Sequence, residues 1–234
     1  MTTNALMMKS IVAKALLSIA IMATSLTLLS CSHTSSHDEG AAQTSINTPV
    51  NMNTNNDSLW QNAYVRVEPT ELKDNVIDLI SRQWMLVTAG NERSFNTMTA
   101  SWGAMGELWH KHAAFIFIRD TRYTYEFLQR EQAYTLSFFA EDYRHALNIC
   151  GTRSGRATDK VKEAGLTPVA TPTGMMTFAE ARMVIECRTM LQQPLDLNYL
   201  TPAYRDEVMR NCYTSDTARH QLFVGEIVNV WLKK

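Results

Sequence analysis

The stretch Ser94–Gly103, with the sequence SFNTMTASWG, is small and hydroxyl-rich and ends in tryptophan and glycine. Threonine favours β-strands, and the stretch lies between two other strand-like runs, Trp84–Ala89 and Ala113–Ile118. We therefore expect a strand here, within a fold dominated by strands. Because its side chains are small and polar, we do not expect an ordinary hydrophobic core to cover it.

Strand-like runs recur later in the chain, with short helices between them. Further strands are expected at Tyr134–Phe139, Arg182–Cys187 and His220–Leu232. Short helices are expected at Leu72–Ile80 after Pro69, at Tyr123–Arg130, at Asp142–Asn148 with a Cys150-Gly151 cap, and at Pro202–Asn211. This pattern, without an internal repeat, predicts a mainly β fold, a β-barrel with peripheral helices, rather than a doubly wound parallel sheet.

The composition describes a globular chain with little electrostatic bias. Its 234 residues are 45% hydrophobic, which is enough for one packed domain once terminal segments are removed. The formal net charge is −1, so no nucleic-acid partner is expected. Four cysteines are too few for a disulfide scaffold. We expect Cys150, Cys187 and Cys212 to be buried, unreactive thiols.

Several motifs that identify active sites are missing from the sequence. There is no dinucleotide-binding G-x-G-x-x-G, no phosphate-binding P-loop and no G-x-S-x-G nucleophile elbow. His110 and His112 share one face of an expected strand, but no third ligand follows at a sensible spacing. We therefore expect neither a metal site nor a serine hydrolase.

The N-terminus has the organisation of an export signal. Lys9 and Lys14 precede the apolar run Ala15–Leu29, which is short and rich in Ser and Thr for a membrane span. The run ends in Leu28-Leu29-Ser30-Cys31, which resembles the bacterial lipobox, in which lipid is attached to the cysteine thiol. The alternative is an ordinary signal peptide or a single membrane anchor with an incidental cysteine.

The lipobox interpretation divides the chain into three parts. Residues 1–30 are expected to be a lipoprotein signal peptide and residues 31–58 a polar tether beginning at the lipidated Cys31. Residues 59–234 are expected to form the folded domain. The expected location is the bacterial cell envelope, through a lipid anchor in the membrane. Ser32 after the cysteine favours the outer membrane.

Four segments carry a resemblance to a known family. They are Asn96–Gly103 (NTMTASWG), Phe115–Leu128 (FIFIRDTRYTYEFL), Leu147–Pro168 (LNICGTRSGRATDKVKEAGLTP) and His220–Lys234 (HQLFVGEIVNVWLKK). In this order and spacing they resemble the flavin reductase-like family of FMN-binding split barrels. The similarity covers nearly the whole expected domain. It implies an FMN-binding split β-barrel, FMN as cofactor and a homodimer.

The resemblance places the first of these segments beside the isoalloxazine ring of FMN. Such a ring needs hydrogen-bonding groups at its edge and a flat surface near its face. Thr97, Thr99 and Ser101 offer hydroxyls, Ala100 permits close approach, and Trp102 adds aromatic area. From the residues alone, a polar-faced strand without a ligand is the preferred interpretation, and the resemblance changes the preference to a flavin contact.

The FMN phosphate is a dianion that suits fixed donors and guanidinium groups. The segment running from Arg119 to Thr124 lies between an expected strand and an expected helix, and it also contains Arg122 and Tyr123. Arg122 and Thr124, together with the amides of a helix N-terminus, form a plausible anion site. The alternative for Arg119 is an ion pair with Asp120 or a solvated strand end.

A second basic cluster follows at Ser154, Arg156 and Lys160, of which we assign Ser154 and Lys160 to cofactor binding. The alternative is a solvated basic turn. Two positions depart from the family's usual pattern. Ala157 stands where relatives often have aspartate, and Lys111–Ala113 occupies a place where they tend to have proline.

The resemblance implies an FMN-dependent oxidoreductase, most simply an NAD(P)H:flavin reductase-like enzyme that passes electrons to a small-molecule acceptor. His220 starts the last expected strand, where relatives commonly keep a histidine near the flavin or nicotinamide. Because the flavin carries the chemistry, no catalytic residue in the strict sense is expected. The alternatives are an exported FMN-binding protein or electron carrier without nicotinamide turnover, and a structural surface lipoprotein.

Overall fold

The computed structural model describes residues 60–213 and 219–234. The expected signal peptide, the tether and the lipidation site Cys31 lie outside the described residues, which begin at Trp60. Within the described ranges, no helix is long and apolar enough to cross a membrane.

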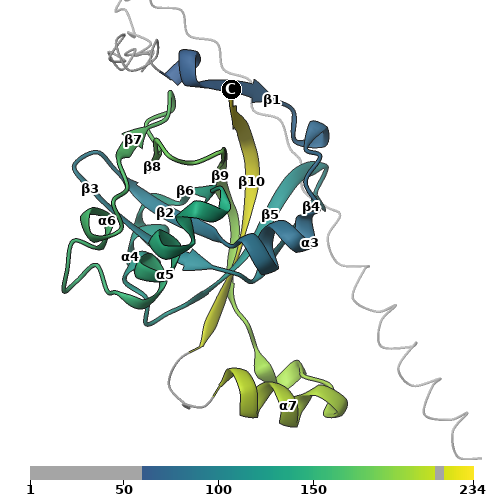
Figure 1. The fold of residues 1–234 in the computed structure, drawn as a ribbon. Coiled ribbons are helices and arrows are strands. Elements are labelled where there is room, and N and C mark those ends of the chain that lie inside the picture. Colours follow the sequence, from purple (N-terminus) through teal and green to yellow (C-terminus); the bar gives the residue numbers. More distant parts are fainter. Residues whose placement is uncertain (1–59, 214–218) are drawn as a thin grey trace, which may run out of the picture. The chain divides into compact units, whose positions relative to one another are not determined.

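One antiparallel sheet organises the described residues, and its strands run in the order β3-β2-β6-β9-β10-β5-β4, with β1 added beside β10 (Figure 1). A separate hairpin pairs β7 with β8. The strand bounds are β1 Tyr64–Val67, β2 Met85–Asn91, β3 Ser94–Ala100, β4 Gly103–Leu108, β5 Lys111–Arg119, β6 Ala133–Phe138, β7 Pro168–Ala170, β8 Met176–Phe178, β9 Met183–Pro194 and β10 His220–Lys233.

The two ends of this strand order are neighbours in the chain. β3 ends at Ala100 and β4 begins at Gly103, so only Ser101 and Trp102 separate the two edge strands. β3 also lies against β5 although the two strands are not paired. The sheet therefore curls around one interior and leaves a split at Ser101–Trp102, as the split-barrel prediction requires.

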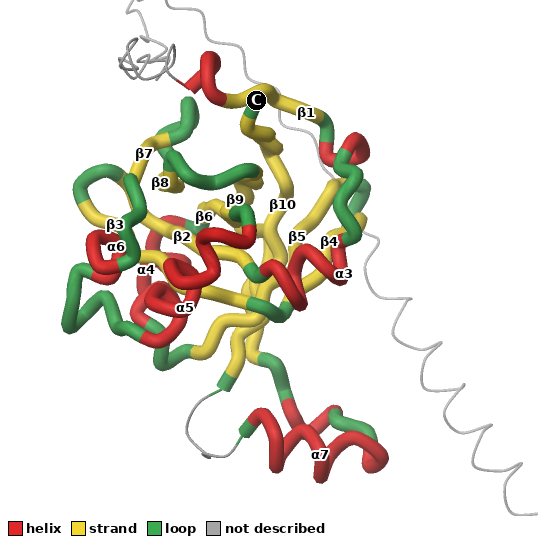
Figure 2. The backbone as a smooth tube through the Cα atoms, viewed as in Figure 1, coloured by secondary structure: helices red, strands yellow, loops and turns green. Residues whose placement is uncertain are grey.

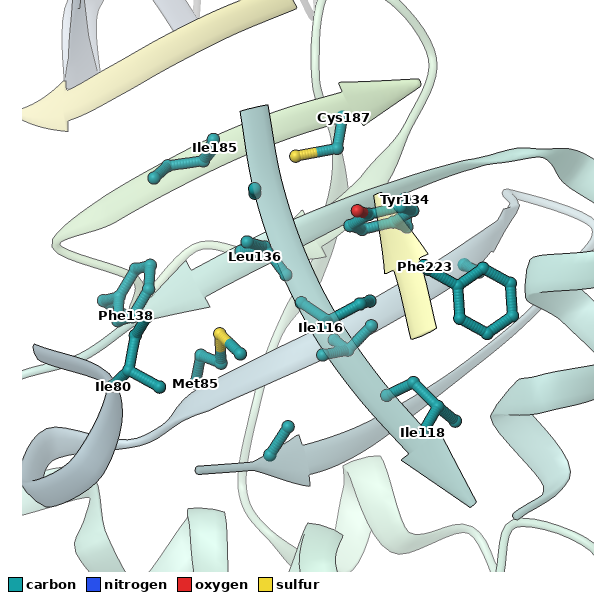
Figure 3. Close-up of a cluster of buried hydrophobic side chains, with 14 of the residues drawn as sticks. Ile80, Met85, Ile116, Ile118, Tyr134, Leu136, Phe138, Ile185, Cys187 and Phe223 are labelled. Carbon is teal, nitrogen blue, oxygen red and sulfur yellow. The ribbon is translucent and has the colours of Figure 1, made fainter. Parts of the chain in front are cut away.

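Alternation of side chains along the strands creates two cores. The first fills the barrel and includes Met85, Ile116, Leu136 and Phe223 (Figure 3). The second lies on the outer side of the same strands. It contains residues such as Leu86, Leu147, Phe178 and Val184. Neighbouring residues of β2 divide between the two cores, because successive side chains of a strand point to opposite faces.

Short helices cover this sheet (Figure 2). Phe127 and Leu128 of α4 belong to the first core, whereas Leu147 and Cys150 of α5 belong to the second, so these helices clamp β2 and β3 from opposite sides. The bounds are η1 Pro69–Glu71, α3 Val76–Asp78, η2 Leu79–Gln83, α4 Tyr123–Glu131, η3 Glu141–Tyr143, α5 Arg144–Thr152, α6 Lys160–Glu163, η4 Leu197–Tyr199 and α7 Pro202–Cys212.

The structure confirms the mainly β fold and corrects several expected boundaries. The helix expected at Leu72–Ile80 is only the three-residue α3 followed by a π-turn. α5 continues through Cys150-Gly151 to Thr152, so that pair does not end the helix. β1, β4, β7 and β8 were not expected. Cys150 and Cys187 are buried, but Cys212 is partly exposed.

Candidate functional site

A small cavity of about 180 Å³ opens where β5 ends and α4 begins. Its walls come from β3, from the β5–α4 turn and from the loop between α5 and α6. Four of the lining side chains are cationic and none is acidic. The lining residues are Met98, Arg119, Thr121, Arg122, Tyr123, Thr124, Arg153, Ser154, Gly155 and Lys160. This charge balance favours an anion in the cavity.

The local chain at α4 adds to this positive field. The helix starts at Tyr123, its N-cap Arg122 has extended backbone, and no side chain caps the first turn. The first amides of an α-helix have no partner within the helix, and the helix dipole places partial positive charge there. An anion in the cavity therefore meets a nine-residue helix at its favourable end.

Lys160 is the buried cation of the cavity, with only 4% of its surface exposed. Its Nζ donates to the carbonyl oxygens of Cys150 at 3.1 Å and Arg153 at 3.2 Å. Burial lowers the pKa of Lys160 to about 8, the nearby Cys150 raises it, and the charge of Arg122 lowers it further. A lysine in this state gains from a bound anion, which stabilises its charged form.

The arginines at the cavity are anchored less deeply. Arg122 is exposed and its Nη1 donates to the carbonyl oxygen of Gly151 at 3.1 Å. Arg119 is half-buried and its Nη2 donates to the carbonyl oxygen of Cys212 at 2.8 Å. Both guanidinium groups keep further N–H donors, since one hydrogen bond engages only one of five.

Asn96 holds the two halves of the cavity together from β3. Its Nδ2 donates to Oγ1 of Thr124 at 2.7 Å and to the carbonyl oxygen of Thr97 at 3.3 Å. A Cβ at position 155 would lie 2.0 Å from Oδ1 of Asn96, so Gly155 is required for this close approach. The asparagine thus fixes the loop after α5 against the start of α4.

The hydroxyls of β3 are directed away from the cavity. Oγ1 of Thr97 lies 2.8 Å from Oγ1 of Thr88 and donates to the carbonyl oxygen of Val87 at 3.3 Å. Thr99 donates to the carbonyl oxygen of Leu147 in α5. By strand alternation, the opposite face of β3 carries Asn96, Met98 and Ala100 towards α4 and the barrel interior.

The split of the barrel carries Trp102 and His220. The two rings are 4.8 Å apart, and Trp102 is 42% exposed whereas His220 is buried. Nδ1 of His220 lies 2.8 Å from Oη of Tyr213. Burial and the neighbouring Arg119 lower the pKa of His220 to about 4, so its ring is neutral at physiological pH. Arg119 and His220 are also register partners of β5 and β10.

The structure brings most of the sequence-predicted site residues together. Six of them surround the cavity: Arg119, Arg122, Tyr123, Thr124, Ser154 and Lys160. Trp102 and His220 form a second group at the split, with Ser101 half-buried beside them. Thr97, Thr99 and Ala100 present no side chain to the cavity.

The sequence analysis did not assign five residues at the cavity: the lining residues Met98, Thr121, Arg153 and Gly155, and Asn96 beside them. Arg153 contributes a lining guanidinium, and Asn96 links the walls. Arg153 directly precedes the assigned Ser154 and extends the same basic turn, which was the available signal. Arg156 lies outside the cavity. It pairs with Glu126, and its guanidinium lies 4.7 Å above the ring of Tyr123.

A wider groove of about 710 Å³ adjoins the cavity and shares Gly155 and Lys160 with it. Its remaining walls come mainly from the loop before α6 and from the start of β3, including Phe95 and Arg156. Among residues 60–213 and 219–234, no group of three or more His, Cys, Asp or Glu side chains is arranged to hold a metal ion.

A curled antiparallel sheet with a cation-lined cavity at one strand end defines a small β-barrel protein whose cavity is suited to an anion. The chain belongs to the flavin reductase like domain family, because the family model matches residues 77–234. A search of curated protein sequences found no match.

Solved structures with the same fold have distant sequences. One is an FMN-binding domain of a flavin reductases-like enzyme from Shewanella baltica, with 14% identity and a TM-score of 0.52 over 72% of this chain and 76% of that chain. Another is an FMN-binding protein from Thermus thermophilus with bound p-hydroxybenzaldehyde, with 18% identity and a TM-score of 0.50 over 72% and 83%. A third is nitrilotriacetate monooxygenase component B from Bacillus cereus, with 16% identity and a TM-score of 0.50 over 71% and 80%.

Proposed function

We propose that the chain binds FMN and acts as a flavin-dependent oxidoreductase. The observation that carries this proposal is the cation-lined cavity at the N-terminus of α4. Its donor set fits a phosphate ester: guanidinium groups, a desolvated ammonium, a hydroxyl from Ser154 and the first amides of a helix. Arg122 and Lys160 would hold the phosphate.

The strand leading from the cavity to the split supports the ring of the same ligand. The backbone of Thr99–Trp102 would supply hydrogen-bonding groups at the edge of the ring. Because Thr99 is already hydrogen-bonded to Leu147, its hydroxyl acts by fixing the strand against α5. The ring of Trp102, which is 42% exposed, would cover one side of the bound flavin and shield it from water.

Bound FMN would supply two-electron chemistry, accepting a hydride from a reduced donor and returning electrons to an acceptor. The residues of the chain bind and orient the reactants. His220 holds no positive charge at neutral pH, so it places an uncharged ring and one N–H at the split. No side chain has to donate a proton for the hydride step itself.

We propose NAD(P)H as the electron donor and a small molecule as the acceptor. The test is to mix the FMN-loaded protein anaerobically with NADH and, separately, with NADPH, and to follow the yellow absorbance. Bleaching within seconds to minutes is the expected result. Loaded protein that stays yellow with both donors would exclude the reductase function and leave FMN binding intact.

The second candidate function is an exported FMN-binding electron carrier that does not turn over nicotinamide. The observation in its favour is the lipobox ending at Cys31, because a protein outside the cytoplasm meets little NAD(P)H. In this proposal Cys31 carries the lipid and the domain is tethered in the bacterial envelope. Cys31→Ala should leave an unprocessed precursor that no longer carries lipid. A variant that is processed and fractionates like wild type would refute the anchor.

We also propose that the domain forms a homodimer. Phe115, Phe117 and Leu222 are half-buried on the face of β5 and β10 opposite the barrel core, and Phe117 is the register partner of Leu222. A second copy of the chain would cover this apolar face. Sedimentation of the purified domain measures the mass directly. A monomer at micromolar concentration would contradict the proposal.

A further inference from the structure

A long excursion separates the last two strands of the sheet. After β9 ends at Pro194, the chain forms η4 and α7 before β10 begins at His220, and Figure 1 shows α7 projecting beyond the ends of these strands. The excursion starts with a hydrogen bond from the amide of Leu195 to the carbonyl oxygen of His220, 2.9 Å long. Arg119 holds its far end through the carbonyl oxygen of Cys212.

This excursion lines an open apolar pocket of about 390 Å³ next to the barrel. Trp102 is its only wall from the barrel's split. All other walls come from the excursion itself. The lining residues are Trp102, Leu195, Asp196, Leu197, Tyr199, Leu200, Val208, Cys212 and Tyr213. Most of these side chains are aliphatic or aromatic, so the pocket favours an apolar molecule.

The pocket meets the proposed flavin site at Trp102. This ring lines the pocket and also lies against His220, and Trp102 is the last residue of the stretch proposed to border the flavin. Tyr213 makes a similar link, since it lines the pocket and its hydroxyl bonds the buried His220. A molecule in the pocket would therefore lie beside the proposed position of the flavin ring.

We infer that the pocket binds the aromatic ring of an uncharged electron acceptor, a one-ring or two-ring quinone in size and chemistry. The role of the ligand as an electron acceptor rests on the proposed function. Its binding rests on the pocket alone. The volume lies in the range of small-molecule sites, and apolar walls with few polar groups are typical of them. Trp102 offers an exposed ring against which a planar ligand stacks.

The charge of the pocket selects against anions. Of the described residues that line the pocket, Asp196 is the only charged one, and its Oδ1 accepts a hydrogen bond from the amide of Asn198 at 2.9 Å. Arg119 and Arg205 donate to the backbone carbonyl oxygens of Cys212 and Leu200, and neither of their side chains lines the pocket. An acidic analogue would place its carboxylate among apolar side chains and a like charge, which is unfavourable.

The test measures binding of duroquinone, an uncharged tetramethyl benzoquinone, to the full domain by equilibrium dialysis. Wild type should bind duroquinone, and 2,4,6-trimethylbenzoate should bind at least about tenfold more weakly, because its buried charge lacks a partner. Val208→Arg fills the pocket from α7 and should weaken duroquinone by about 10- to 200-fold. Leu197→Asp tests the facing wall in the same way.

Tyr204→Arg is the matched control. It changes charge by the same amount on the same helix, but Tyr204 is 62% exposed and does not line the pocket. Duroquinone that binds wild type and Val208→Arg equally, or binds neither, would overturn the inference. Each measurement is made with and without FMN. Suppose that the protein does not bind FMN, but binds duroquinone and loses that binding in Val208→Arg. This result would refute the proposed function and leave the pocket assignment standing.

Discussion

The two walls of the candidate flavin site differ in how their polar groups are used. On β3, the hydroxyls of Thr97 and Thr99 are already engaged with Thr88, Val87 and Leu147. At the cavity, Arg122 makes one hydrogen bond to the chain and keeps other donors available. The hydroxyls of the β3 wall therefore already have hydrogen-bond partners within the protein, whereas the cavity wall keeps N–H donors that an anion can use.

This difference assigns separate tasks to the two walls. Hydrogen bonds made within the protein stabilise the strand and contribute nothing new when a ligand arrives. Donors that water still occupies can be transferred to a ligand, and charged ones contribute most. The phosphate end should therefore dominate affinity, while β3 positions the ring through its backbone.

The largest expected effect is the loss of the phosphate contact at Arg122. Charge-assisted hydrogen bonds are worth about 1.5–3 kcal/mol, so Arg122→Ala should weaken FMN by about 10- to 150-fold. Riboflavin, which lacks the phosphate, should bind as before. Titration of both flavins into wild type and variant measures this contrast.

Arg130→Ala is the control for this experiment. Arg130 lies in the last turn of the same helix, outside the cavity, and pairs with Glu131 at 2.7 Å. The control should bind both flavins like wild type. Equal losses of FMN and riboflavin in Arg122→Ala would show general damage instead of a phosphate contact.

The second prediction concerns the threonine hydroxyls of β3, which are already hydrogen-bonded within the protein. Thr97→Val leaves the buried hydroxyl of Thr88 without its partner, which should lower the free energy of unfolding by about 1–3 kcal/mol. FMN affinity should hardly change, because the lost hydroxyl does not face the cavity. Denaturant unfolding and flavin titration of the same variant measure the two quantities.

The double variant Thr88→Val/Thr97→Val sharpens this result. Replacing both partners removes the unsatisfied hydroxyl, so the double variant should recover part of the stability lost in Thr97→Val. A large loss of FMN affinity in the stably folded double variant would place a flavin contact on the threonines after all.

The smallest expected effect is a pH dependence set by Lys160. Its pKa is about 8 in the free protein, so the ammonium loses its proton as the pH rises through 8. A bound anion favours the charged form and raises that pKa. FMN affinity should therefore be constant from about pH 7, where the phosphate is a dianion, and fall above pH 8 by at most about tenfold per unit.

Lys160→Met separates this titration from others in the site. Methionine keeps much of the length of the side chain without a charge, so the variant should bind FMN more weakly and lose the decline above pH 8. If FMN affinity declines above pH 8 in Lys160→Met as it does in wild type, another group is responsible for the decline.

Much of the fold was predictable because its signals are local. The long strands and α4 have clear patterns within a few residues, and the segment from Arg119 to Thr124 carries its basic and hydroxyl groups contiguously. β4 was missed because GAMGEL has little strand propensity and becomes a strand by pairing with β5. β7 and β8 have only three residues each, too few for any periodicity.

The parts of the site that were missed depend on tertiary contacts. Asn96 matters because Thr124, 28 residues later, meets its amide. The hydroxyls of Thr97 and Thr99 were visible in the sequence, but their partners on β2 and α5 were not. A sequence shows which donors a segment carries, whereas the fold decides which donors are already in use.

The excursion from Leu195 to Arg219 has a consequence for how this barrel can change over generations. Its first residue is held by the Leu195–His220 backbone hydrogen bond, and its last residue is held to the turn after β5 by the Asp120–Arg219 backbone hydrogen bond, so the strand register is set outside it. Lengthening a loop whose ends are held together costs little, about 0.6 kcal/mol for each doubling. The sequence and length of the excursion can therefore change during evolution, and with them the molecules that bind to it. The barrel and its cation-lined cavity need not change.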